Sequence, residues 1–196
     1  MKKMINWTLI TTLGSIALIH AEPNTLTELK FSYFYPSSKT LREIYGTGGI
    51  NYELAFSYYV WKDLALKVAG DFFIKEGHSL NGDQKTRLEI LPVSLGTFYA
   101  YRMGMHSLYG GGGLRYFFVK IKNDSSSVSS HSYGNGIGGY LEGGYLATFD
   151  DWFSFDLFAN YSFRRLSLHS KHIPNVEQTS IEVGGLNIGA GIGFKF

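Results

Sequence analysis

A serine, a histidine and a carboxylate must converge at one site for acyl-transfer chemistry, and one candidate set lies near the end of this chain. Ser167 and His169 are two residues apart, so on an extended strand their side chains project from the same face. Glu177 or Glu182 could approach them from the segment that follows. A serine two residues before a histidine is common by chance in loops. We therefore expect no catalytic site here.

Histidines offer the other candidate chemistry. His131 with Ser130 or Ser132 is a poorer pair, because adjacent residues of a strand point to opposite faces. His169 and His172 could hold a metal, but no nearby carboxylate completes the site, and a solvated loop is the simpler interpretation. The chain has no cysteine, which excludes disulfides and thiolate metal sites. We expect no metal site and no cofactor.

Two glycine-rich stretches resemble phosphate-binding motifs. Residues 134–139 match G-x-G-x-x-G, which binds dinucleotides when a strand precedes it and a helix follows. Here a serine-rich stretch precedes it and a strand pattern follows. Residues 109–116 contain four consecutive glycines inside another strand pattern, with no Lys-Ser or Lys-Thr after them. Both stretches indicate strands that need close backbone packing and curvature.

Period-two alternation runs through the chain and predicts strands. In the last stretch, 180–196, apolar residues at even positions from Leu186 onward alternate with small or polar ones. We predict eight strands, at 26–36, 43–60, 64–75, 86–101, 108–121, 133–148, 153–166 and 180–196. Tight turns are expected at 61–63, 102–107 and 149–152, and longer loops at 37–42, 76–85, 122–132 and 167–179. Pairing of the last strand with the first would close the sheet into a barrel.

The alternation changes phase once, near Leu91 and Pro92. Leu88 and Ile90 are apolar before this point, and Val93 continues the apolar series after it in the other phase. Proline cannot donate a hydrogen bond to a central ladder, so we predict a β-bulge there, with Leu88 and Ile90 facing outward.

Two observations indicate that the apolar face of the barrel points outward. Small residues such as Gly111 and Gly189 share the charged face, as in a crowded interior. Aromatic residues gather near both ends of the predicted strands, as two membrane interfaces require. An even number of antiparallel strands, with short turns at one end and longer loops at the other, is the pattern of a transmembrane β-barrel.

An outward apolar face would place the charged residues inside. We predict a lumen network of six acids and six bases: Glu28, Lys30, Glu53, Lys67, Asp71, Lys75, Glu89, Arg115, Glu142, Asp156, Arg164 and Lys195. Such balance avoids unpaired buried charges, which are costly. Eight strands leave an interior just wide enough for side chains, so a filled ion-pair network is expected and a proton or ion path is the alternative.

The first 21 residues are predicted to be a secretory signal peptide, and 22–196 one barrel domain. Lys2 and Lys3 precede an apolar segment at 7–19, and Ala21 provides a small residue for cleavage. That segment is shorter than the ~20 residues of a spanning helix. The chain has 18 lysines and arginines against 16 acidic residues. Loss of Lys2 and Lys3 would equalise them, which argues against a nucleic-acid partner.

The C terminus resembles the assembly signal of bacterial outer-membrane proteins. Gly191 is followed at +3 by Phe194 and at +5 by the terminal Phe196, as in that signal; Gly189 stands where the family prefers a polar residue. The mature chain is similar in architecture to the small outer-membrane barrels of the OmpA-domain, OmpX/Ail and OmpW type. The resemblance implies an eight-stranded up-and-down barrel, inserted into the outer membrane by the barrel-assembly machinery. It identifies no subfamily.

We therefore expect an integral outer-membrane protein with a structural or surface-interaction role, such as membrane integrity or adhesion through its loops. Basic residues outnumber acids near the loops, among them Lys85, Arg87, Lys120 and Lys122, and would meet the phosphates of lipopolysaccharide. A surface ligand bound by the loops is a further expected partner. The alternatives are a narrow channel or carrier for small or apolar solutes, and a lipid A-modifying enzyme.

Overall fold

The computed structural model describes residues 25–78, 85–124, 129–149, 152–167, 169–170 and 180–196. Nearly all of them lie in strands. The elements are β1 (Thr25–Pro36), α2 (Lys39–Tyr45), β2 (Gly49–Tyr59), β3 (Leu64–His78), β4 (Lys85–Met103), β5 (His106–Asp124), β6 (Ser129–Thr148), β7 (Phe153–Phe163), β8 (Arg165–Ser167), β9 (His169–Ser170), β10 (Ser180–Glu182) and β11 (Gly185–Lys195). No helix in this part of the chain is long and apolar enough to cross a membrane.

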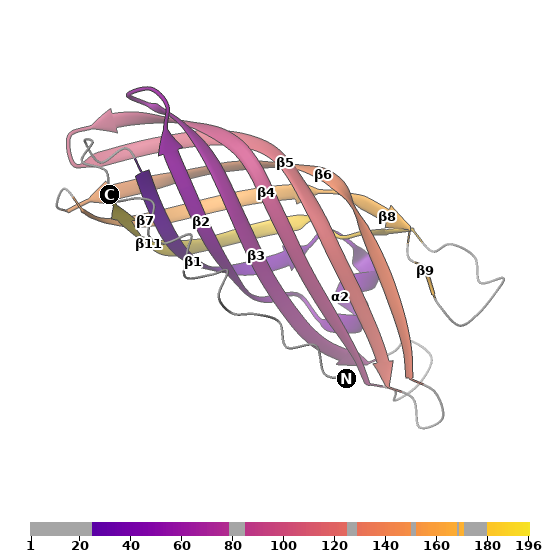
Figure 1. Cartoon of the computed structure of the whole chain (residues 1–196). Helices are drawn as coiled ribbons and strands as arrows, with labels where there is room; N and C mark the ends of the chain where they lie inside the picture. The colour runs from indigo at the N-terminus through magenta and orange to yellow at the C-terminus, as the bar shows by residue number, and fades with distance from the viewer. Residues whose placement is uncertain (1–24, 79–84, 125–128, 150–151, 168, 171–179) are drawn as a thin grey trace, which may run out of the picture.

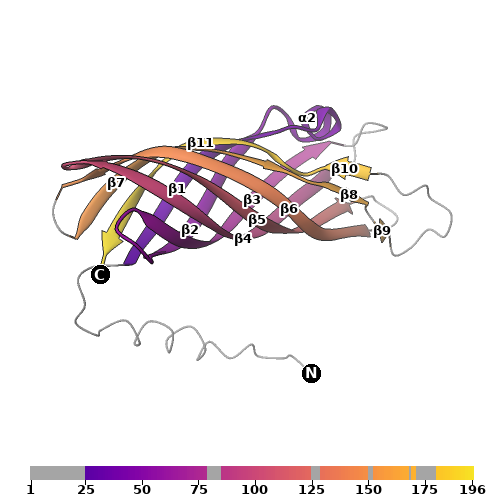
Figure 2. The same ribbon diagram turned by 90° about the horizontal axis from the view of Figure 1, so that it is seen from above.

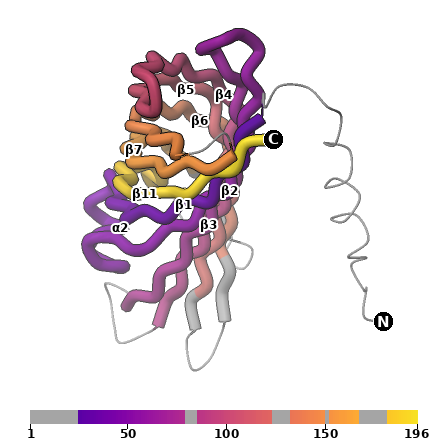
Figure 3. The backbone as a smooth tube through the Cα atoms, turned by 90° about the vertical axis from the view of Figure 1, so that its left-hand side faces the viewer, coloured from indigo at the N-terminus to yellow at the C-terminus, as the bar shows by residue number. Residues whose placement is uncertain are grey.

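Eight long antiparallel strands close into a barrel, as predicted (Figure 1). Each strand pairs with its neighbours in sequence, and β11 returns to pair with β1 from Leu26↔Lys195 to Pro36↔Gly185. Figure 3, in which the end carrying the C terminus faces the viewer, shows β1 beside β11. The pairing runs around the whole wall in its turn-end part, whereas β3 beyond Phe73 and β6 before Gly139 extend past their neighbours β2 and β7 toward the loop end.

The apolar face of the wall points outward, as the alternation indicated. Lys30 and Arg115 are each 2% exposed, whereas the outward residues Leu54 and Leu141 are 56% and 63% exposed. Such a distribution is the reverse of a soluble barrel, in which the apolar face would form the core.

The two ends of the barrel differ, as Figure 2 shows. The turn end carries the short β2–β3 and β4–β5 connections and the C terminus, and Gly104 adopts a positive φ of 67° in the β4–β5 turn. The loop end carries α2, β8 and β10. Strands β3 to β6, with 15 to 20 residues each, run further toward the loop end than the others (Figure 1).

The prediction for residues 37–48 was wrong, because the chain forms helix α2 where a loop and the start of a strand were expected. The Ser38 hydroxyl caps this helix by accepting a hydrogen bond from the Leu41 amide at 3.3 Å. Leu41 and Tyr45 are one helical turn apart and both are buried. The helical spacing of these two residues, which period-two alternation does not describe, directs them into the barrel end.

The predicted bulge at Leu91 and Pro92 was also wrong. The β3–β4 register is the same on both sides, with Gly70↔Val93 before the gap and Phe73↔Ile90 after it, and pairing is only interrupted between them. Pro92, which has no N–H, lies in this interruption. The strand does not change phase: Leu88 and Ile90 are buried inside the barrel instead of facing outward. What changes is the polarity of the interior.

The last two predicted strands are each divided. Strand 153–166 separates into β7 and β8, and strand 180–196 separates into β10 and β11. β8 and β10 pair with each other, for example Ile181↔Leu166, and form a small two-stranded sheet. Leu166 and Ile181 are buried, so this sheet contributes apolar side chains to the loop end of the interior.

Candidate functional site: the barrel interior

Lys30 is the centre of a buried group of charges in the middle of the barrel. Its Nζ lies 2.6 Å from Asp156, 3.2 Å from Glu142 and 3.6 Å from Glu28. The Tyr109 hydroxyl donates to Asp156 at 2.9 Å. These side chains come from β1, β5, β6 and β7, so one lysine joins strands on opposite sides of the barrel.

Glu142 links this lysine to a second one. Lys67 Nζ lies 2.7 Å from Glu142 and 2.9 Å from Glu53. Glu142 therefore accepts from Lys30 and Lys67 together, and a charge-assisted bond of this kind is stronger than a neutral one.

Arg115 forms the third cationic centre. Its guanidinium lies 3.3 Å from Asp71, donates to Ser94 at 2.7 Å, and stacks over the Tyr140 ring at 4.8 Å. Asn51 also donates to Asp71, at 3.0 Å. Eight side chains make up what we call the ionic cluster: Glu28, Lys30, Glu53, Lys67, Asp71, Arg115, Glu142 and Asp156.

The ionic cluster accounts for eight of the twelve residues predicted for the lumen, and the other four lie elsewhere. Lys75 faces inward but is partly exposed beyond the cluster, and Arg164 is exposed between β7 and β8. Lys195 lies at the turn end, where it donates to Thr148 at 3.1 Å. Glu89 lies on the outer face of β4 and contacts Lys122 at 2.7 Å.

The placement of Glu89 in the lumen is contradicted by the wall geometry. It followed from the predicted bulge, and without the bulge the residue keeps the same outward parity as Leu91 and Val93. Its side chain is 25% exposed. Of the twelve charged residues, Glu89 is therefore the one that belongs to the outer surface at the loop end.

An apolar cluster that was not predicted from the sequence fills the loop end of the interior. Its buried members are Phe34, Leu41, Tyr45, Phe73, Leu88, Ile90, Phe117, Val119, Leu166, Ile181 and Val183. Strands of the wall, α2 and the β8–β10 sheet all contribute to it. The sequence did contain a sign of this cluster. Phe34 and Phe117 stand at positions whose side chains point inward, between aromatic neighbours that point outward.

Little space remains in the described middle of the interior, whereas a hollow of about 300 Å³, lined among others by Tyr59, Ser107 and Leu146, lies at the turn end. Between the ionic and apolar clusters lies a cavity of about 10 Å³, lined among others by Asp71, Ile90, Pro92 and Arg115. A volume of this size holds about one water molecule. At the turn end, Phe98 packs with Tyr59, Ala65, Ala100 and Tyr109.

The predicted assembly signal forms the seam of the barrel. Gly191 pairs with Lys30 and Phe194 stacks on Trp152 with ring centroids 5.9 Å apart. The Phe196 side chain is 60% exposed, and its backbone exchanges hydrogen bonds with Thr25.

The candidate catalytic set cannot be placed as a set. The side chains of Ser167, His169 and His131, and the whole of Glu177 and His172, lie outside the described residues. Glu182 is exposed and its carboxylate lies 3.7 Å from Arg165. The described residues contain no group of three side chains that could hold a metal.

The glycine-rich stretches lie in strands, as predicted. Residues 109–116 belong to β5 and residues 134–139 to β6. A Cβ on Gly111 or Gly113 would collide with the backbone of β4. Close approach of β4 and β5 therefore requires glycine at these two positions.

Comparison with known proteins supports the fold and adds no sequence relative. No family model matches the chain, and no curated protein matches it. OprG from Pseudomonas aeruginosa is similar in structure, with a TM-score of 0.66, 16% identity, and coverage of 90% of this chain and 97% of that chain. Neisserial surface protein A gives a TM-score of 0.58 at 16% identity, covering 88% and 97%. The Escherichia coli outer membrane protein W gives 0.55 at 14% identity, covering 91% and 100%. The chain has the fold of small eight-stranded outer-membrane barrels, which confirms the fold that the resemblance implied.

Proposed function

We propose that this chain is an integral outer-membrane protein with a filled, non-conducting barrel, which acts through its surface in membrane integrity or in contact with ligands at its loop end. The observation that carries the proposal is the reversed polarity of the wall, apolar outside and charged inside. Buried charges are tolerated where they are paired, and an exposed apolar band requires lipid around it. The predicted signal peptide, outside the described residues, would direct export.

The filling of the interior supports a barrel that does not conduct. The ionic cluster crosses the middle, and the apolar cluster covers it on the loop side. An ion entering from the loop end would have to displace packed residues such as Phe117 and Leu88, which are each 1% exposed.

Planar-bilayer recording tests this proposal. The refolded mature chain should give no unitary current, while a general porin in the same bilayers gives steady steps. Heat-modifiable migration of the same preparation on a gel establishes that the barrel is folded. Regular ohmic steps from the folded fraction would overturn the proposal.

A carrier for small apolar solutes is the second candidate, and the interruption in the β3–β4 ladder favours it. Phe72 and Leu91 lie opposite each other in the register but are not paired. A hollow lined by Phe72 and Leu91 lies on the outer side of this wall segment, and the small cavity lined by Asp71 and Pro92 lies on the inner side. A lateral passage for an apolar solute could open here.

A cross-link across the interruption separates the two candidates. The chain has no cysteine, so F72C/L91C places one disulfide across the gap without competing thiols. A carrier would lose uptake of an apolar dye into proteoliposomes when oxidised and recover it when reduced. A protein that acts only through its surface would show no change between the two states.

An enzyme remains a different class of function, and the proposal assigns none. Lipid A mass spectra from cells with and without the protein should be identical. A change in acylation would overturn this part of the proposal.

A further inference from the structure

We infer that the outer wall formed by β3–β6 carries a binding site for a phosphorylated lipid of the outer leaflet, of the lipid A class. The inference rests on the membrane location proposed above, but it does not depend on whether the lumen conducts. It concerns two adjoining hollows on the outer face and the charges between them.

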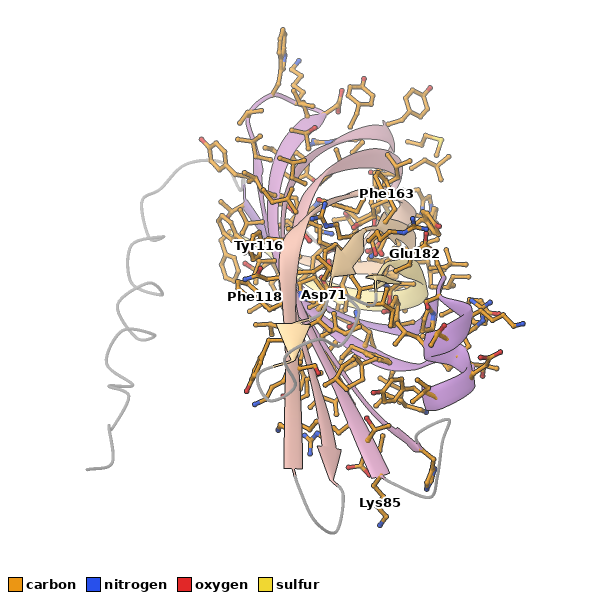
Figure 4. The ribbon with its side chains drawn as sticks, turned by 90° about the vertical axis from the view of Figure 1, so that its right-hand side faces the viewer. Asp71, Lys85, Tyr116, Phe118, Phe163 and Glu182 are labelled. Atoms are coloured by element: carbon orange, nitrogen blue, oxygen red, sulfur yellow. The ribbon has the colours of Figure 1, made fainter. Side chains whose placement is uncertain are left out.

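The first hollow, which we call the outer hollow, has a volume of about 620 Å³. Most of its lining is apolar or aromatic, including Phe72, Leu91, Phe118 and Tyr133. Figure 4 shows Tyr116 and Phe118 on the outer side of the wall, with Asp71 within the barrel. An acyl chain would find apolar contacts in this hollow.

The second hollow, of about 470 Å³, is polar. Its lining includes Glu76, His78, Lys85, Arg87 and Lys122. Lys85 marks the loop-end limit of β4 in Figure 4. Because Arg87 and Glu89 are successive outward residues of β4, and Lys122 and Lys120 of β5, the two hollows are contiguous along the wall.

The boundary between the hollows lies at the level of lipid head groups. Leu91↔Phe118 is the last apolar pair of β4 and β5 on the outer face, and Glu89↔Lys120 is the next outward pair. From Tyr101 to Leu91, a tilted strand spans about 25 Å along the membrane normal, which matches the apolar band of outer-membrane barrels. Arg87 and Lys122 therefore lie where lipid phosphates would be.

The charges favour an anion. Among the described residues that line the two hollows, four are bases, Lys85, Arg87, Lys120 and Lys122, and two are acids, Glu76 and Glu89. Glu89 contacts Arg87 at 3.2 Å and Lys122 at 2.7 Å. Lys120 lies over the Tyr133 ring at 5.6 Å and makes no ion pair within 4.0 Å among the described residues.

Lys120 is thus a cation beside an apolar hollow, and Glu89, the residue opposite it in the register, contacts Arg87 and Lys122 instead. A lipid phosphate would act as the counter-ion of Lys120, and it would accept charge-assisted hydrogen bonds from Lys120 and Lys122. A free phosphate would leave the outer hollow unused, whereas a phosphorylated lipid fills both hollows at once. The shared chemistry is the phosphate, and the apolar hollow selects the lipid as its source.

Native mass spectrometry of the full mature chain in detergent micelles tests this site. The probe is bisphosphorylated lipid A, and the counter-probe is the same lipid without phosphates. K120Q/K122Q should weaken binding of the probe by about tenfold or more, because charged hydrogen bonds are lost. The matched control K39Q/K62Q, which removes two lysines on α2 and at the turn end, should leave the affinity unchanged.

Three further variants test the direction of the charge effect and the position of the acyl chain. E89Q removes the acid that holds Arg87 and Lys122 and should tighten binding, the opposite of K120Q/K122Q. F118A should weaken binding, and L114A, which alters an outward residue nearer the middle of the membrane, should not. These opposed changes would not follow from a general loss of positive charge.

Three results would overturn the inference. One is equal binding of the phosphorylated and dephosphorylated lipids by the wild-type chain, a comparison that needs no variant to fold. Another is an equal loss in K39Q/K62Q and K120Q/K122Q. The third is full displacement by millimolar inorganic phosphate, which would indicate a free-anion site. A conducting barrel would contradict the proposed function and leave this site intact.

Discussion

At the scale of single residues, Glu142 links two of the three cations of the ionic cluster, Lys30 and Lys67. Its carboxylate lies 2.7 Å from Lys67 and 3.2 Å from Lys30, and the Tyr109 hydroxyl oxygen lies 3.3 Å from it. All three partners come from other strands. Removal of its charge would take one buried counter-charge from each lysine, although Lys30 keeps Asp156 and Lys67 keeps Glu53, and a lost buried partner costs more than a lost surface ion pair.

E142Q is therefore expected to destabilise the barrel by roughly 3–5 kcal/mol, the range for one partner removed from a buried pair. The free energy of unfolding would be measured by urea titration of the chain refolded into vesicles. E43Q is the matched control, because its partner Lys39 lies 3.7 Å away on the exposed face of α2. Similar losses in both variants would contradict a central role for Glu142.

The ionic cluster contains more carboxyl groups than cations. It contains five carboxyl groups and three cations, so the described middle of the barrel is not balanced as the sequence indicated. Neutral side chains donate hydrogen bonds to two of the carboxylates: Asn51 donates to Asp71 at 3.0 Å, and Tyr109 donates to Asp156 at 2.9 Å. The expected six-to-six balance counted Lys75, Arg164 and Lys195, which lie outside the cluster.

At the scale of elements, α2 and the β8–β10 sheet cover the loop end of the interior. Leu41 and Tyr45 of α2 are buried in the apolar cluster, and the Tyr45 hydroxyl shares a hydrogen bond of 2.9 Å with Thr86 of β4. A seven-residue helix has little stability of its own, so this packing must hold it in place.

L41A should lower the free energy of unfolding by about 2–5 kcal/mol, the usual cost of removing a buried leucine side chain. Thr40 is exposed on the same helix, so T40A serves as the control and should change stability little. Protease cleavage in the 37–48 segment, followed by mass spectrometry, would reveal opening of the loop end in L41A. An unchanged cleavage pattern would count against α2 as the cover of the interior.

The last strand ends on Phe196, whose backbone and side chain have different surroundings. Phe196 is bound to β1 through backbone hydrogen bonds, while its side chain remains 60% exposed. The ring therefore adds little to the folded barrel. From the resemblance of the C terminus to an assembly signal, we propose that the barrel-assembly machinery recognises this ring before the seam closes.

Deletion of Phe196 is accordingly expected to reduce the amount of protein in the outer membrane more than it reduces the stability of the barrel. Quantitative blots of outer-membrane fractions measure the first effect, and urea unfolding of the refolded variant measures the second. K195Q, which changes the neighbouring residue and keeps the terminal ring, is the control. Normal outer-membrane levels of the deletion variant would refute the assignment.

At the scale of the whole molecule, polarity inverts along the barrel axis on both faces of β4 and β5. The interior changes from the ionic cluster to the apolar cluster at Pro92, and the exterior changes from apolar to charged between Leu91 and Glu89. Where both faces change polarity, the apolar residues move to the other set of alternating positions although the strand keeps its register. In the sequence this looks like a shift of one residue, and it led to the wrong prediction of a bulge. The two changes coincide because the wall leaves the apolar band at that level.

The whole chain should therefore behave as an integral membrane protein. In fractionated cells it should sediment with the outer membrane, resist carbonate extraction, and migrate on gels as a heat-modifiable band. The folded band should disappear on boiling, since closed barrels unfold only with strong heating in detergent. Recovery in the soluble fraction without detergent would contradict the membrane location.

The sequence by itself determined the closed antiparallel barrel and the direction of its apolar face. Period-two alternation, glycines such as Gly111, and the pairing potential of the final strand are local properties that survive without tertiary context. The seam between β1 and β11 followed because unpaired edge strands are unfavourable.

Only the tertiary structure decided the filling of the interior and the position of Glu89. Alternation assigns a residue to one of two faces, but it does not say how the environment of a face changes along the barrel. Leu88 and Ile90 lie inside because α2 and the β8–β10 sheet provide apolar partners there, and these partners are distant in sequence. Contacts of that kind depend on the closed wall, which brings the loop-end elements over its interior.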